Sequence, residues 1–205
     1  MNTSKLAYQF KITLAEILPP IWRRIQVPAK YSFWDLHVAL QDSIGWLDYH
    51  LHMFRFRKPH KKAVVEIGIP GDEMDDHITL PGWEISIGDY FTEPGNVALY
   101  EYDFGDIWEH ELLLEGIQLK EEGAKYPRCI AGERACPPED CGGVPGYYRL
   151  LEILSNPKHD EYMQTIDWLK GHAKSYYPYR PDEFEPEKVH FDNPKKRWKI
   201  AFSKP

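Results

Sequence analysis

Two runs of residues that alternate between apolar and polar side chains constrain the fold of this chain more than any other feature. The first covers residues 6 to 14 and the second begins at residue 108. Their alternating positions are Tyr8, Phe10, Ile12 and Leu14, then Trp108, His110, Leu112 and Leu114. Because successive side chains of a strand point to opposite faces, each run predicts a strand with one buried face.

Other segments of the sequence predict helices and further strands. Ser32 precedes Asp35 by three residues, which is typical of a helix start, and apolar residues at helical spacing follow up to Gly45. Further strands are expected over residues 21–27, 50–56, 64–69 and 97–104, and helices over 147–154, 160–171 and 194–202. The sequence therefore predicts an α+β protein, with a mostly antiparallel or mixed sheet from residues 1–120 packed by helices, and a helical C-terminal third. We expect residues 1–205 to form a single domain.

Composition and charge narrow the classes of function. The chain has 205 residues, 42% of them hydrophobic, and a formal net charge of -7. This aromatic-rich composition predicts a packed globule, and the negative charge does not support nucleic acid as a partner. The start of the chain lacks the apolar core of a signal peptide, and no run of about twenty apolar residues follows. We therefore expect a cytoplasmic protein without a membrane partner.

The segment from residue 121 to 146 holds all three cysteines, Cys129, Cys136 and Cys141, together with four prolines and five glycines. Its composition excludes a regular helix or a central strand and favours a long loop. Three thiolates at this spacing, with His110 as a fourth ligand, are one possible tetrahedral zinc site. The alternative is that the three thiols are small buried side chains that only pack.

A second pair of candidate ligands is His50 and His52. On a strand, residues two apart project from the same face, so the two imidazoles would be able to share one metal ion. The alternative is one buried, hydrogen-bonded histidine and one exposed histidine. His110, which shares the parity of Trp108, is expected to face the core and to need a partner for each ring nitrogen.

Four acidic residues complete the candidate polar site. Asp103 and Asp106 flank the turn between the two strands of a predicted hairpin, where they would either contribute to a site or bond the amides of the turn. Glu139 and Asp140 stand between two prolines and Cys141-Gly142-Gly143, a context that fixes the backbone around them. The phrase Pro-Pro-Ile-Trp-Arg-Arg at 19–24 is expected to be structural, with contact to an anion through Arg23 or Arg24 as the alternative.

Four phrases carry a resemblance to a known family. They are Pro-Pro-Ile-Trp-Arg-Arg at 19–24, Gly-Trp-Leu-Asp-Tyr-His-Leu-His-Met-Phe at 45–54, Tyr-Asp-Phe-Gly-Asp-Ile-Trp-Glu-His at 102–110, and the cysteine-containing phrase at 127–143. Together they resemble the plasmid pRiA4b ORF-3-like family over about residues 8–200. The resemblance implies an association with mobile elements and no particular activity.

Three functions stay open at this point. The first is a non-catalytic binding or accessory module for an unknown protein or small ligand, because phosphate-binding glycine loops and hydrolase motifs are absent from the sequence. The second is a metal-dependent hydrolase or nuclease that uses the histidines and aspartates. The third is a structural zinc protein that uses the cysteine loop.

Overall fold

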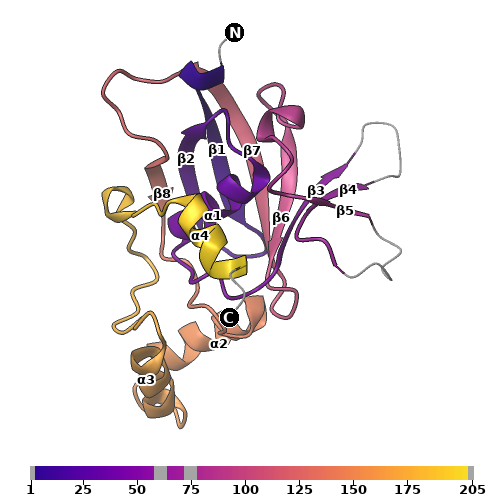
Figure 1. Ribbon diagram of the computed structural model, residues 1–205. Coiled ribbons are helices and arrows are strands. Elements are labelled where there is room, and N and C mark those ends of the chain that lie inside the picture. The colour runs from indigo at the N-terminus through magenta and orange to yellow at the C-terminus, as the bar shows by residue number, and fades with distance from the viewer. Residues whose placement is uncertain (1–2, 58–63, 72–77, 203–205) are drawn as a thin grey trace.

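The computed structural model describes residues 3–57, 64–71 and 78–202. They form one eight-stranded sheet, with helices around it (Figure 1). The strand order is β5-β4-β3-β6-β7-β1-β2-β8. Neighbouring strands are antiparallel except for the parallel pair of β4 and β5, so the sheet is mixed. The strands are β1 (Leu6–Leu14), β2 (Trp22–Pro28), β3 (His52–Arg57), β4 (Val64–Gly68), β5 (Thr79–Pro81), β6 (Val97–Tyr102), β7 (Trp108–Leu119) and β8 (Arg128–Glu133).

The centre of the sheet consists of the alternating runs. Phe10 on β1 and Trp108 and Leu112 on β7 are fully buried, and their neighbours along each strand are more exposed. β1 pairs with β7 from Leu6 opposite Leu119 to Leu14 opposite His110. The period-two pattern thus sets which face of the sheet meets the core.

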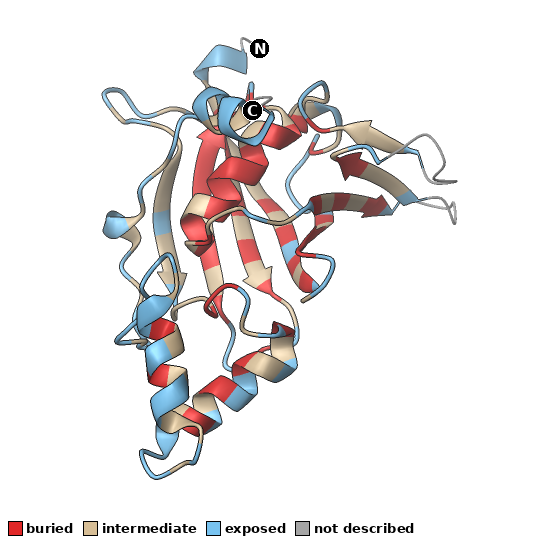
Figure 2. Ribbon diagram, turned by 60° about the horizontal axis from the view of Figure 1, so that its bottom comes forward, coloured by how far each residue is buried: buried red, intermediate tan, exposed pale blue. Residues whose placement is uncertain are grey.

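Helix α1 (Phe33–Ile44) covers this face. Ser32 and Asp35 form a reciprocal capping box at its start, and Gly45 ends it in the left-handed conformation with φ 94°. Ten of its twelve residues are buried, and the helix is largely red in Figure 2. α1 is therefore a core helix rather than a surface helix.

The C-terminal third adds three helices, α2 (Gly143–Ser155), α3 (Tyr162–Gly171) and α4 (Pro194–Phe202). α2 and α3 lie beyond one end of the sheet, whereas α4 lies beside α1 (Figure 1). The indole of Trp34 on α1 donates to the Pro194 carbonyl and meets the Trp198 ring edge-on. Residues 172 to 193, which we call the strap, connect α3 to α4 and include the short 3-10 helix η3 (Pro186–Lys188). Two further 3-10 turns are η1 (Thr3–Lys5) and η2 (Ile87–Asp89).

The fold confirms the predicted α+β class and mixed sheet. One detail of the prediction is wrong, because the cysteine segment is not a continuous loop. Residues 128 to 133 form β8, which pairs with β2 at the edge of the sheet, where irregular composition is tolerated better than in a central strand. Among the described residues, the helices are too short or too polar to cross a bilayer.

Candidate functional site

Three polar side chains from three different connections meet at the end of the sheet nearest α2. His50 lies in the connection from α1 to β3, Asp103 follows β6, and Asp140 precedes α2. His50 Nε2 is 2.8 Å from Asp140 Oδ1 and 3.6 Å from Asp103 Oδ2. One ligand atom from each residue lies within 4.8 Å of the other two, the single such group of three or more among the described His, Cys, Asp and Glu residues.

A buried hydrogen-bond network explains why these residues meet. The Tyr102 hydroxyl donates to Glu139 and accepts the backbone N–H groups of Tyr49 at 3.0 Å and His50 at 3.3 Å. Glu139 is 1% exposed, and its other oxygen accepts the N–H of Leu47 at 2.7 Å. Burial, followed by the bond to Glu139, raises the pKa of Tyr102 far above its usual range. Tyr102 precedes Asp103 and Glu139 precedes Asp140, so this pair links all three connections.

The turn between β6 and β7 positions Asp103. Its Oδ1 accepts the N–H groups of Gly105 at 2.9 Å and Asp106 at 3.3 Å, which confirms that Asp103 bonds the amides of its turn. Oδ2 is left to face His50. Asp103 has φ 57°, a left-handed conformation that aspartate tolerates better than most residues.

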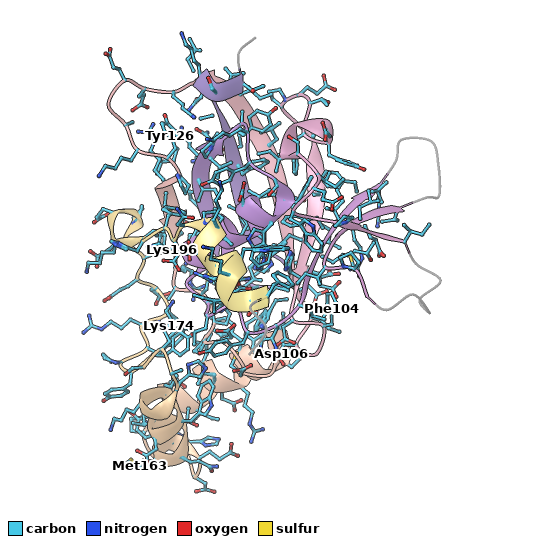
Figure 3. All side chains as sticks on the ribbon, viewed as in Figure 1. Phe104, Asp106, Tyr126, Met163, Lys174 and Lys196 are labelled. Atoms are coloured by element: carbon cyan, nitrogen blue, oxygen red, sulfur yellow. The ribbon has the colours of Figure 1, made fainter. Side chains whose placement is uncertain are left out.

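The glycines after Asp140 allow its loop to approach this turn. Gly142 donates its N–H to Asp106 Oδ2 at 3.1 Å. A Cβ atom at Gly143, which has φ 66°, would lie 2.5 Å from the Asp106 carbonyl oxygen. Asp106 therefore joins the two loops, and its labelled position beside Phe104 marks this corner of the molecule in Figure 3.

His172, at the end of α3, is a neighbour of the site that the sequence did not reveal. Its Nε2 lies 3.6 Å from Asp140 Oδ2, and its side chain is 9% exposed. A cavity of about 270 Å³ between α2 and α3 opens beside Asp140 and is lined by Arg149, Glu161 and Trp168 among others. No spacing or motif in the sequence connects His172 to the other residues, since α2 and α3 separate it from Asp140.

The cysteines are not part of this cluster. All three are free thiols, and no three of Cys129, Cys136, Cys141 and His110 form a group of the kind that His50, Asp103 and Asp140 form. Cys136 accepts a hydrogen bond from Arg23, whereas Cys141 lines the cavity between α2 and α3. Burial raises the pKa of the Cys141 thiol to about 12. The geometry thus gives the predicted cysteine site no support.

His52 does not share the face of His50 as the strand pattern predicted, because β3 begins only at His52 and His50 belongs to the preceding connection. His52 is instead buried and stacked on His37, with 3.5 Å between ring centroids. Burial first, and then the neighbouring His37, lowers the pKa of His52.

His110 faces the core, as its parity with Trp108 predicted. Its Nδ1 lies 3.3 Å from the Tyr100 carbonyl oxygen, and Nε2 has no hydrogen-bond partner. Desolvation lowers the pKa of His110 to about 4. Both His52 and His110 are therefore neutral core residues near neutral pH.

The fold and the cluster together define an α+β protein with a His-Asp-Asp group at one end of its sheet. The chain belongs to the plasmid pRiA4b ORF-3-like protein family, whose model matches residues 6–188. It is 33% identical over 161 residues to the uncharacterized protein y4hQ of Sinorhizobium fredii (strain NBRC 101917 / NGR234), covering 78% of this chain and 79% of that protein. A crystal structure of a protein of unknown function from Methanosarcina mazei Go1 is similar with a TM-score of 0.78 and 41% identity, over 91% of this chain and 98% of that chain.

Proposed function

We propose that this protein is a metal-dependent binding module, which holds one divalent transition-metal ion at His50, Asp103 and Asp140. The observation that carries the proposal is the approach of three ligand atoms from three separate connections to within 4.8 Å of one another. An imidazole combined with carboxylates suits zinc, manganese or iron.

The spacing of the ligand atoms supports an ion of this kind. Ligands at about 2.0 to 2.2 Å from a tetrahedral ion lie about 3.3 to 3.6 Å from one another. His50 Nε2 already lies 3.6 Å from Asp103 Oδ2, and its 2.8 Å contact with Asp140 has only to lengthen slightly. The Tyr102–Glu139 pair would hold the backbone of the ligands in place, which is the role of outer partners in metal sites.

Three protein ligands leave at least one coordination position for water or for an exogenous ligand. His50 and Asp140 have side-chain exposures of 33% and 46%, so that position faces solvent. The cavity beside Asp140 gives a bound molecule room next to the ion. We prefer a binding function to a catalytic one, because the described residues around the cluster form no acyl-transfer or phosphate-binding motif.

Metal-dependent hydrolysis is a second candidate, favoured by the same open position. A metal ion there would lower the pKa of a bound water and supply a nucleophile. It predicts Mn²⁺- or Zn²⁺-dependent cleavage of p-nitrophenyl phosphate esters that is lost in Asp140→Asn.

The association with mobile elements stays a prediction, in agreement with the plasmid named in the family's description.

Titration calorimetry with Zn²⁺ and Mn²⁺ on chelator-treated protein tests the proposal. We expect about one ion per chain, and at least a tenfold loss of affinity in His50→Ala and in Asp140→Asn. His190→Gln and Asp160→Asn remove the same side-chain types from exposed positions outside the cluster and serve as matched controls. Unchanged affinity in the two cluster variants, or no binding by the parent protein, would refute the proposal.

A further inference from the structure

A second and larger cavity, of about 670 Å³, lies between the C-terminal end of α1, the segment after β8, and the strap. It shares no residue with the His50, Asp103 and Asp140 cluster. Its walls carry the aromatic rings of Trp46, Tyr176 and Tyr179, together with several cationic side chains. The cavity is therefore an independent site to consider.

Most of the cations that line this cavity are already paired. Arg197 contacts Asp42 and Asp192, and the more exposed Arg180 and Lys188 contact Glu183 and Glu185. Each of these cations leaves no unbalanced charge for a ligand to neutralise.

Arg23 differs from them, because the residue is 2% exposed and its guanidinium pairs with no carboxylate in the described part of the chain. It donates to the carbonyl oxygens of Ser43, Trp22 and Glu133 and to the sulfur of Cys136, while the Phe184 ring lies 3.5 Å from its central carbon. These neutral partners use four of the five N–H groups of the guanidinium. A buried cation without an opposite charge is costly, so its field favours an anion in the adjacent cavity.

Lys174 supplies a second cation from the strap, where Figure 3 labels it between α3 and α4, and unlike Arg23 it is exposed. Its ammonium donates to the Gly45 carbonyl and, among the described residues, forms no ion pair. Arg23 donates to the Ser43 carbonyl and Lys174 to the Gly45 carbonyl, and both side chains line the cavity. The two cations therefore lie at the same end of α1, on the same part of the cavity.

We propose that this cavity binds a small organic anion, with its carboxylate or phosphate group between Arg23 and Lys174 and its apolar part against the rings of Trp46, Tyr176 and Tyr179. The Cys136 thiol would lie beside the anionic group. This assignment goes beyond metal binding at the other site and stands independently of it.

Benzoate and phenyl phosphate serve as the carboxylate and phosphate probes, and benzyl alcohol as the matched neutral probe. Calorimetry or ligand-observed NMR on chelator-treated protein separates this site from the metal site. We expect one or both anions to bind about tenfold more tightly than benzyl alcohol, with an affinity that falls as salt rises. The anion that binds more tightly identifies the preferred group.

Lys174→Gln is the decisive variant, because this exposed side chain can be replaced without opening the core. We expect it to weaken binding of the preferred anion about fivefold or more. Lys170→Gln is the matched control, since Lys170 lies over Tyr177 and outside the cavity lining, and it should bind as the parent does. Equal binding of the neutral probe and both anions, or equal affinity in Lys174→Gln and Lys170→Gln, would overturn the assignment.

Discussion

Two adjacent regions of the molecule are stabilised in different ways. One is the sheet together with α1, and the other is the strap. In β1, β7 and α1 the buried side chains recur at regular intervals and pack on one another. In the strap, residues 172 to 193, no residue is buried. It is attached by single contacts, such as the Ala135 N–H to the Pro181 carbonyl at 2.9 Å and the Tyr179 hydroxyl to the Cys136 carbonyl at 3.1 Å.

The two regions therefore owe their stability to different kinds of contact. The regular region is stabilised by many apolar contacts, each of which depends on its neighbours. The strap depends on a few anchors, among them Phe184, whose ring packs so close to β8 that a Cβ at Gly132 would lie 2.4 Å from it. The larger cavity lies between the two regions, so the anchors of the strap also define one wall of it.

The largest expected effect comes from a pair of matched truncations. Phe10→Ala removes a fully buried ring from the central strand and should lower the free energy of unfolding by about 3 to 5 kcal/mol. Phe184→Ala removes a half-buried ring from the strap and should cost only about 1 kcal/mol. Urea unfolding measures both. Equal losses in the two variants would contradict the distinction between the regions.

Acid should destabilise the sheet region through its buried histidines. His110 has a pKa of about 4 when folded, below the usual value near 6.5, so the unfolded chain binds a proton first as pH falls. Stability is therefore lost between about pH 6.5 and 4, to a limit of about 3 kcal/mol from this residue. His110→Phe should flatten this part of the pH dependence, which thermal unfolding across the range measures.

His190→Gln is the control for that experiment, because His190 is exposed on the strap. It should keep the pH dependence of the parent. His52, which is also buried, keeps part of the acid sensitivity in both variants. A pH dependence in His110→Phe that matches the parent would show that the His110 side chain does not resist protonation in the folded state.

Tyr102→Phe should have a smaller effect on stability and a specific effect on the cluster. It removes the hydroxyl that joins Glu139 to the backbone of Tyr49 and His50, at a cost of about 1 to 3 kcal/mol. We expect metal affinity to fall about 10- to 100-fold, as it does when outer partners are removed. Tyr148→Phe, which removes an exposed hydroxyl, should change neither quantity appreciably. Full metal affinity in Tyr102→Phe would show that the hydrogen-bond network of Tyr102 does not support metal binding at the cluster.

Much of the regular region could be predicted from the sequence, because alternation and capping are local signals. The spacing of Ser32, Asp35 and Gly45 located α1, and the parity of Trp108 placed His110 in the core. β8 escaped prediction because its cysteine and glycine give little alternation and because pairing with β2 is a long-range interaction. The candidate site was predicted only in part for the same reason.

His50, Asp103 and Asp140 were each candidates, but local patterns paired His50 with His52 and the cysteines with His110. What brings the three together is the Tyr102–Glu139 hydrogen bond, which joins residues 37 positions apart. His172 and the unpaired charge of Arg23 depend on tertiary contacts in the same way. No periodicity in the sequence encodes such contacts.

Crystals of the protein soaked with Mn²⁺ or Zn²⁺ and measured at the absorption edge of the metal test the central proposal most directly. We expect an anomalous peak about 2.0 to 2.3 Å from the ligand atoms of His50, Asp103 and Asp140. A peak only at the cysteines, or no peak at the cluster under saturating metal, would contradict it.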